Sequence, residues 1–130
     1  MRFILENRTN NNILIVNDSL TLNTLLQLTL EAEGFDVVFA ETGLDGLKEA
    51  MSGQYNLILL DYVLPDINGL DVCRKLRKEP LTKNTTIAFI SGKDESEISE
   101  AIVRAGADAY INPPFMGTVF INRINELIKC

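Results

Sequence analysis

Four polar side chains with useful chemistry stand in the sequence just after short apolar runs. They are Asn17, Asp18, Asp61 and Ser91. Carboxylate and amide oxygens suit a hard cation such as Mg²⁺, which prefers oxygen ligands and usually keeps several waters. A carboxylate beside Mg²⁺ can attack phosphorus, and a serine hydroxyl can donate a hydrogen bond to a phosphoryl oxygen. These residue types therefore point to phosphoryl chemistry on a carboxylate.

Each of these residues also has a structural interpretation. Asp18 would serve well as the N-terminal cap of a following helix, and Ser91 would close a turn. Asp61 is harder to explain in this way, because an acid that ends a wholly apolar strand is costly unless it faces an open crevice. Position alone leaves both interpretations of the cluster open.

The elements that must position these residues are visible as two kinds of segment. Short apolar runs predict strands at residues 13–16, 37–40, 57–60, 87–90 and 109–111. They lack in–out alternation, as expected for parallel strands covered on both faces. Apolar residues at helical spacing predict helices over about 19–33, 43–52, 69–78 and 95–105, and a last helix after Pro113-Pro114. Gly34 and Gly106 are expected to end the first and the fourth helix.

Strand–helix alternation repeated five times predicts an α/β fold with one parallel sheet and helices on both faces. In such a sheet, ligands bind in the crevice beyond the carboxyl ends of the strands. The polar residues after the apolar runs would therefore meet at one edge. Residues 1–11 are expected to form a flexible leader, and residues 12–130 a single domain.

The composition excludes several classes of function. The chain has no histidine, so it is not a histidine phosphodonor, a His-ligated zinc protein or a Ser-His-Asp hydrolase. The net charge of -6 disfavours direct binding to nucleic acid or to an anionic membrane. No apolar run approaches the roughly 20 residues of a membrane span. A soluble protein in a reducing, cytoplasmic setting is expected, because the two cysteines form no CxxC pair.

Two further features have structural interpretations. Cys73 lies at helical spacing with Val72 and Leu76, which indicates a buried small side chain. A basic stretch is interpreted as a solvated face of the third helix and its exit; it comprises Arg74, Lys75, Arg77, Lys78 and Lys83.

Four segments, in the right order, resemble the receiver domain of two-component response regulators. The most specific is 57–69 (LILLDYVLPDING), which resembles the phosphoacceptor strand and loop, with Pro65 and Gly69 four and eight residues after the aspartate. Segments 13–19 and 87–92 resemble the first strand with its acidic pair and the strand that ends in a switch Ser or Thr. Segment 106–115 resembles the fifth strand and its Lys-Pro-Phe corner. The resemblance covers about residues 12–129 and implies a flavodoxin-like, doubly wound, five-stranded (βα)5 fold.

The resemblance implies a role for each acidic-site residue. Asp61 would accept a phosphoryl group from the phosphohistidine of a histidine kinase or a phosphotransfer protein. Asp18, Asp61 and the backbone carbonyl of Val63 would bind Mg²⁺ directly. Asn17 would reach the metal through a water.

The resemblance also implies how the signal leaves the domain. Ser91 would bind a phosphoryl oxygen and move on activation, Tyr110 would be the aromatic switch residue that turns inward with it, and Gly92 would be the small residue beside the site. Output would pass by protein–protein contact through the helix at 95–105, the strand at 109–111 and the last helix, in a monomer or a phosphorylation-dependent homodimer. Such a domain is not an enzyme beyond self-catalysed phosphotransfer and dephosphorylation.

Two positions depart from the family's pattern. Asn17 replaces the first acid of the pair, which would weaken Mg²⁺ binding. Pro113 stands where the family has a near-invariant lysine, and the lost charge would cost about 2–4 kcal/mol in rate terms. Lys93 is the nearest basic residue in sequence, but it is expected to point to solvent. A cis Pro113–Pro114 bond is compatible with the sequence, as at the corresponding bond of the family.

These departures leave an alternative open: a pseudo-receiver that acts as a constitutive protein-interaction module without phosphorylation. A third hypothesis, a phosphohydrolase of small molecules, shares the aspartate chemistry. It lacks an acid placed just after Asp61, where Val63 stands. We favour the working receiver.

Overall fold

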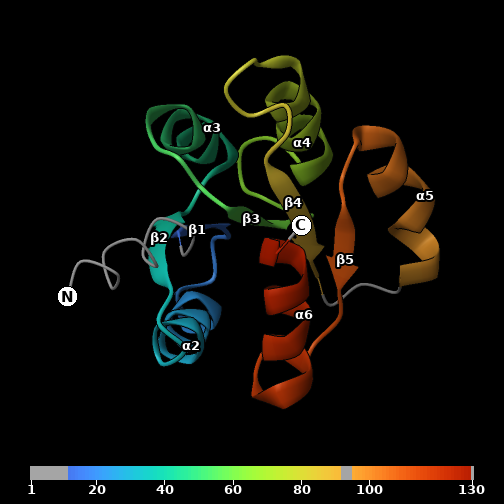
Figure 1. The fold of residues 1–130 in the computed structure, drawn as a ribbon. Coiled ribbons are helices and arrows are strands. Elements are labelled where there is room, and N and C mark those ends of the chain that lie inside the picture. The colour runs from blue at the N-terminus through green and yellow to red at the C-terminus, as the bar shows by residue number, and fades with distance from the viewer. Residues whose placement is uncertain (1–11, 92–94, 130) are drawn as a thin grey trace.

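The computed structural model of the chain describes residues 12–91 and 95–129, which form alternating strands and helices (Figure 1). In chain order the elements are β1 (Asn12–Val16), α2 (Leu20–Glu31), β2 (Asp36–Ala40), α3 (Gly43–Ser52), β3 (Leu57–Asp61), α4 (Gly69–Lys78), β4 (Thr86–Ile90), α5 (Glu95–Ala105), β5 (Ala109–Ile111) and α6 (Gly117–Lys129). Three predicted helices and β5 match the sequence ranges, and the other four strands are one residue longer. The flexible leader expected at 1–11 lies outside the described residues.

The five strands form one parallel sheet in the order β2-β1-β3-β4-β5. This order confirms the predicted doubly wound fold, with its topological switch point between β1 and β3. Val16 of β1 lies opposite Leu60 of β3, and Asp61 lies opposite Ile90 of β4. The register therefore places the residues that follow β1 and β4 on either side of the last residue of β3.

Helices cover both faces of the sheet. Figure 1 shows α2 and α6 on one side, and α3 and α4 on the other. Ile13 and Ile15 of β1 pack with Leu26 of α2 and Ile124 of α6, while the intervening Leu14 belongs to the core beneath α3, α4 and α5. β1, β3 and β4 are buried along nearly their whole length, which explains their continuous apolar runs. The edge strand β2 instead alternates between exposed and less exposed residues, so the expected cover on both faces does not extend to it. No helix within the described residues is long and apolar enough to cross a membrane.

Local signals set the helix ends. The side chains of Ser19, Thr42 and Asn68 accept hydrogen bonds from backbone N–H groups in the first turns of α2, α3 and α4. Gly34 and Gly106 have φ angles of 94° and 95°, a conformation that favours glycine. Both glycines follow a helix as predicted, although α2 ends at Glu31 rather than near residue 33.

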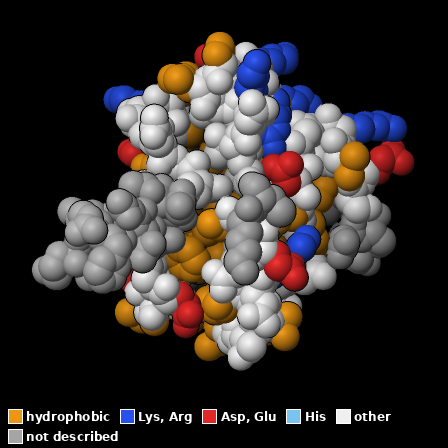
Figure 2. Space-filling model, in the orientation of Figure 1, with side chains coloured by type: hydrophobic (Ala, Val, Ile, Leu, Met, Phe, Trp, Pro, Cys, Tyr) orange, Lys and Arg blue, Asp and Glu red, His pale blue; other side chains and the backbone are white. Residues whose placement is uncertain are grey.

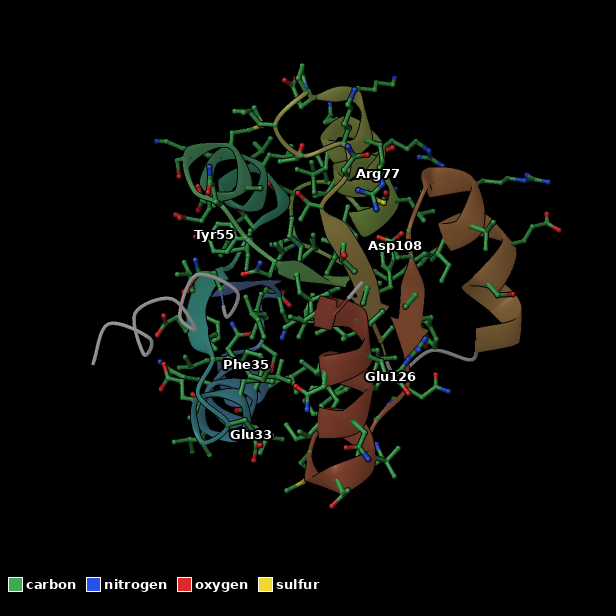
Figure 3. The ribbon with its side chains drawn as sticks, in the orientation of Figure 1. Glu33, Phe35, Tyr55, Arg77, Asp108 and Glu126 are labelled. Atoms are coloured by element: carbon green, nitrogen blue, oxygen red, sulfur yellow. The ribbon has the colours of Figure 1, made fainter. Side chains whose placement is uncertain are left out.

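Arg77 holds together the edge of the sheet where β4 and β5 begin (Figure 3). Its guanidinium donates to the carbonyls of Gly106 (2.8 Å) and Thr85 (2.6 Å) and forms an ion pair with Asp108 (2.8 Å). Asp108 also accepts from the N–H of Ile87 at 2.9 Å. The interpretation of Arg77 as part of a solvated face is therefore wrong.

Several other basic side chains gather near the same end of the sheet. Figure 2 shows Lys and Arg side chains over α4, the loop after it and α5. These elements carry exposed Arg74, Lys75, Lys78, Lys83 and Arg104. Cations near the C-terminal end of a helix interact favourably with its dipole, which fits the basic last turn of α4.

Candidate functional site

Asp61 is the last residue of β3, and its half-buried side chain lies at the carboxyl edge of the sheet. One carboxylate oxygen accepts a hydrogen bond from the N–H of Val63 at 3.4 Å. The loop after Asp61 closes on itself, because the N–H of Gly69 donates to the carbonyl of Tyr62 at 2.9 Å. A Cβ atom at Gly69 would collide with the carbonyl oxygen of Asp61. Glycine at position 69 therefore lets α4 begin directly against the candidate acceptor.

The negative charge of Asp18 acts on Asp61 at this edge. The pKa of Asp61 is raised from 3.8 to about 6, mainly by burial and further by the negative charge of Asp18, while the N–H groups of Val63 and Tyr62 act in the opposite direction. Among the charged side chains that the structure describes, Asp18 alone contributes to this shift. The site is therefore a like-charge pair at an edge of the sheet, which is the electrostatic setting for a bound cation.

Asp18 is exposed and does not cap α2. The cap is Ser19, whose hydroxyl oxygen accepts from the N–H of Leu22 at 3.2 Å. The structural interpretation of Asp18 is thus wrong, and its carboxylate is available to a ligand near Asp61.

Asn17 forms a buried amide pair with Asn23, a residue that sequence reasoning missed. Its side-chain N–H donates to the Asn23 amide oxygen at 3.1 Å, and Asn23 donates to the Asn17 backbone carbonyl at 2.9 Å. Each residue is only 2% exposed. Asn23 shares helical spacing with the buried Leu26 and Leu30, so a polar residue on the apolar face of α2 was the available signal.

Ser91 follows the strand partner of Asp61 and is 8% exposed. The hydroxyl of Tyr110 on β5 donates to the Ser91 backbone carbonyl at 3.1 Å. The structure thus joins the two predicted switch residues directly. Gly92 and Lys93 lie outside the described residues.

Pro113 is exposed and follows β5, where the resemblance leads one to expect a lysine. The Pro113–Pro114 peptide bond is cis, which agrees with the sequence expectation. The corner therefore presents no cation at position 113.

Asp66 is a second residue that the sequence analysis missed. Its two carboxylate oxygens accept from the N–H groups of Gly43 (2.8 Å) and Leu44 (2.9 Å), at the start of α3. These backbone donors lower the pKa of Asp66. No local pattern predicts a contact between residues more than twenty positions apart.

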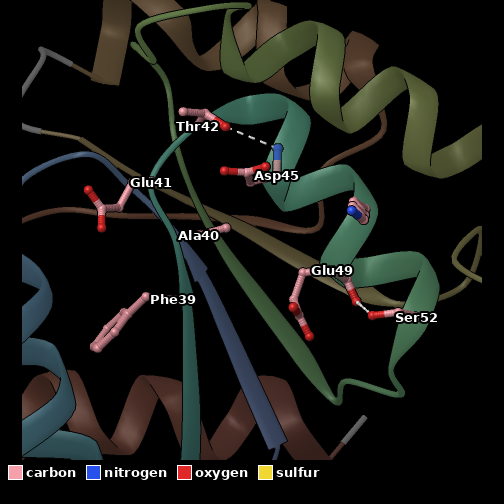
Figure 4. Close-up of a pocket in the computed structure, with 8 residues that line it drawn as sticks. Phe39, Ala40, Glu41, Thr42, Asp45, Glu49 and Ser52 are labelled. Carbon is pink, nitrogen blue, oxygen red and sulfur yellow. Dashed lines mark hydrogen bonds between the residues drawn. The ribbon is translucent and has the colours of Figure 1, made fainter.

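A cavity of about 610 Å³ lies between the end of β2 and α3 (Figure 4). None of its lining residues belongs to the candidate set; they are Phe39, Ala40, Glu41, Thr42, Asp45, Lys48, Glu49 and Ser52. The site at Asp61 is therefore separate from this cavity.

The donor atoms fit Mg²⁺ better than a metal that needs a complete protein cage. Within the described ranges, no group of three or more His, Cys, Asp or Glu side chains is placed to hold a metal. Two carboxylates and a backbone carbonyl match an ion that keeps most of its waters. Asp18, Asp61 and Val63 are the residues that would hold it.

The sequence matches the response regulator receiver domain family over residues 13–125. The chain therefore belongs to that family, whose members are receiver domains of two-component signal transduction. It is 39% identical over 117 residues to the response regulator ArlR of Staphylococcus saprophyticus, across 90% of this chain and 52% of ArlR. The chain thus spans about half the length of the curated relatives that it matches.

Solved structures share this fold. A CheY-like receiver domain protein from Methanospirillum hungatei superposes with a TM-score of 0.83 at 32% identity, over 92% of this chain and 94% of that one. The receiver domain of the sensor histidine kinase PA1611 from Pseudomonas aeruginosa gives a TM-score of 0.84 at 24% identity, over 92% and 98%. The PA1611 domain has a magnesium ion coordinated in its active site cleft.

Proposed function

We propose that Asp61 is the phosphoacceptor of this receiver domain. The observation that carries the proposal is the half-buried Asp61 carboxylate at the carboxyl edge, beside the charge of Asp18 and with a pKa of about 6. At neutral pH the group is mostly ionised, as a nucleophile must be. In the transfer step, an Asp61 oxygen bonds to phosphorus while the phosphorus–nitrogen bond of a partner's phosphohistidine breaks. The imidazole leaves with the electron pair.

The other site residues would support this step. Asp18, Asp61 and the Val63 carbonyl would hold Mg²⁺, which supplies positive charge for the phosphoryl oxygens. Ser91 would donate its hydroxyl to one of those oxygens, and Tyr110 would follow Ser91 through the hydrogen bond between them. Transfer and later hydrolysis would be self-catalysed by this set of groups.

Asn17 and Pro113 would make the site less efficient than one with the family's pattern. The buried amide of Asn17 carries no charge, so it would contribute less to Mg²⁺ binding than a carboxylate. Pro113 supplies no cation to the phosphoryl group. Mg²⁺ affinity and transfer rate would both be lower, although the acceptor itself is retained.

The phosphodonor would be a cytoplasmic histidine kinase or phosphotransfer protein that docks at the edge around Asp61. Three exposed apolar side chains follow the carboxyl ends of different strands: Leu20 (75%), Val63 (56%) and Met116 (50%). They would form the apolar part of the docking contact, because exposed apolar groups at a functional edge favour protein association.

Output would use the face formed by α5, β5 and α6. A groove of about 280 Å³ lies beside β5 on this face and is mostly apolar; it is lined by Tyr110, Ile111, Asn112, Pro113, Pro114, Met116, Val119, Phe120 and Arg123. Because Tyr110 both lines the groove and bonds to Ser91, a change at the phosphoryl site would alter the groove. The partner would be a downstream protein or, after phosphorylation, a second copy.

The test is intact mass spectrometry after incubation with acetyl phosphate and Mg²⁺. We expect one phosphoryl adduct on the parent and on the control Asp36→Asn, in which an exposed acid of β2 is neutralised, and none on Asp61→Asn. If the folded parent gives no adduct, or if Asp61→Asn is still modified, the proposal is overturned. An unmodified, folded parent would indicate a constitutive interaction module.

A further inference from the structure

The loop between β3 and α4 is fastened to a different helix at its midpoint. The two carboxylate oxygens of Asp66 accept hydrogen bonds from the first two N–H groups of α3, one oxygen from each N–H. Hydrogen bonds from backbone amides to an ionised acceptor are stronger than those between neutral groups. The lowered pKa of Asp66 agrees with this arrangement.

Apolar packing completes the same contact. A Cβ atom at Gly43 would lie 2.5 Å from Ile67 Cγ1, 3.0 Å from Val72 Cγ2 and 3.2 Å from an Asp66 oxygen. The absence of a side chain at Gly43 therefore lets the loop and the start of α3 meet closely.

The loop is also fixed at both ends. At its beginning, the N–H of Val63 donates to the Asp61 carboxylate. At its end, Gly69 donates to the Tyr62 carbonyl, and the side chain of Asn68 accepts from the N–H of Asp71. Asp66 thus lies near the middle of a short loop that contains Val63 and leads directly into α4.

We propose that Asp66 is a positioning residue: its bonds to the start of α3 hold the phosphoacceptor loop in the conformation that presents the Val63 carbonyl to Mg²⁺. This inference rests on the metal ligands given under the proposed function. A flexible loop must be ordered when the ion binds, and the loss of conformational entropy weakens binding. A loop already held by Asp66 avoids most of that loss, as second-shell contacts do at other metal sites.

The competing explanation is that Asp66 merely caps α3. That helix already has its own cap, since the Thr42 hydroxyl accepts from the N–H of Asp45 at 3.0 Å (Figure 4). Capping by Asp66 would change the free energy of unfolding but would not change the affinity for Mg²⁺. Affinity therefore distinguishes positioning from capping.

The first experiment is isothermal titration calorimetry with Mg²⁺ on the parent, Asp66→Asn and Asp45→Asn. Asp45→Asn also removes one negative charge near the start of α3, but it leaves the hydrogen bonds from Gly43 and Leu44 to Asp66 intact. We expect Mg²⁺ binding to weaken about tenfold in Asp66→Asn and less than about twofold in Asp45→Asn. If the parent binds Mg²⁺ and Asp66→Asn binds it with equal affinity, the positioning role of Asp66 is overturned while the proposed function stands. A parent that neither binds Mg²⁺ nor is phosphorylated overturns the proposed function.

A second measurement needs no variant, because coupling between two sites is reciprocal. If the loop contact favours Mg²⁺ binding, saturating Mg²⁺ must strengthen the contact. We expect hydrogen exchange of the Gly43 and Leu44 amides to slow by about tenfold on Mg²⁺ addition. The Ile87 amide, which bonds to Asp108 at the opposite edge, serves as the internal reference. Unchanged exchange at Gly43 and Leu44 overturns the proposal.

Discussion

Charged side chains are arranged differently at the two ends of the parallel strands. At the edge where β4 and β5 begin, Arg77 has an acidic partner and several carbonyl acceptors, and Asp108 accepts from both Arg77 and a backbone N–H. At the edge where β1 and β3 end, Asp18 and Asp61 carry charges of the same sign. The exposed cations on α4 and α5 gather near the first of these edges.

The difference separates a structural use of charge from a chemical one. A half-buried guanidinium with a full set of acceptors stabilises the fold, because protein oxygens replace the water acceptors that its N–H groups lose on burial. A pair of carboxylates without a described cation opposes folding at neutral pH and is tolerated where a ligand supplies the missing charge.

Arg77→Met should have the largest effect, a loss of about 3 kcal/mol in the free energy of unfolding. The substitution removes the ion pair and leaves Asp108 and the loop carbonyls without their donor, while much of the apolar stem is retained. Urea unfolding followed by circular dichroism measures the change. Arg74→Met is the matched control, because the Arg74–Asp71 pair is about half exposed (47% and 49%) and should contribute less than about 1 kcal/mol. Similar losses in the two variants would refute the structural role of Arg77.

Asp61→Asn should have the opposite sign and stabilise the protein by about 2 kcal/mol at pH 7. The pKa of Asp61 is higher in the folded chain, at about 6, than the ordinary 3.8. Protonation therefore favours the folded state: this contribution is fully present below about pH 4 and is lost as the pH rises through about 6.

Urea unfolding from pH 4 to pH 7 tests the sign. The difference in stability between Asp61→Asn and the parent should grow over that interval, whereas Asp36→Asn should show no such growth. A difference that stays constant with pH would mean that Asp61 does not carry the raised pKa.

Asn17→Asp should give the smallest effect, lowering stability without Mg²⁺ by about 1 kcal/mol through a third negative charge. The same charge should tighten Mg²⁺ binding several-fold, because affinity rises with the number of carboxylate ligands. Calorimetric titration measures the affinity, with Asn122→Asp on the exposed face of α6 as the control. Unchanged affinity in Asn17→Asp would show that position 17 does not reach the metal.

Local patterns in the sequence were sufficient for the fold and for the position of Asp61. Continuous apolar runs identified the strands, and Gly34 and Gly106 marked two helix ends, because burial and left-handed turns leave signals in neighbouring residues. The strand ends then placed Asp18, Asp61 and Ser91 at one edge, as the register confirms for the residues flanking Asp61.

Contacts between residues far apart in the sequence were not predictable from these local patterns. The Asp66 contact with α3 joins residues 22 and 23 positions apart, and Arg77 meets Asp108 over 31 positions. Arg77 sits in a run of basic residues that looks solvated, because helical spacing does not show which loops pack against the end of a helix. Asn23 was the exception, since a polar residue on an apolar helical face is visible locally.

The most direct test of the central claim, that the like-charge pair at the carboxyl edge is a cation site, is the Mg²⁺ dependence of stability. Urea unfolding of the parent should show a gain of about 1.4 kcal/mol when Mg²⁺ is tenfold above its dissociation constant. The gain should persist in Arg74→Met and be largely lost in Asp18→Asn, an exposed and conservative change. Equal Mg²⁺ stabilisation of the parent and Asp18→Asn, or none in the parent, would contradict the account.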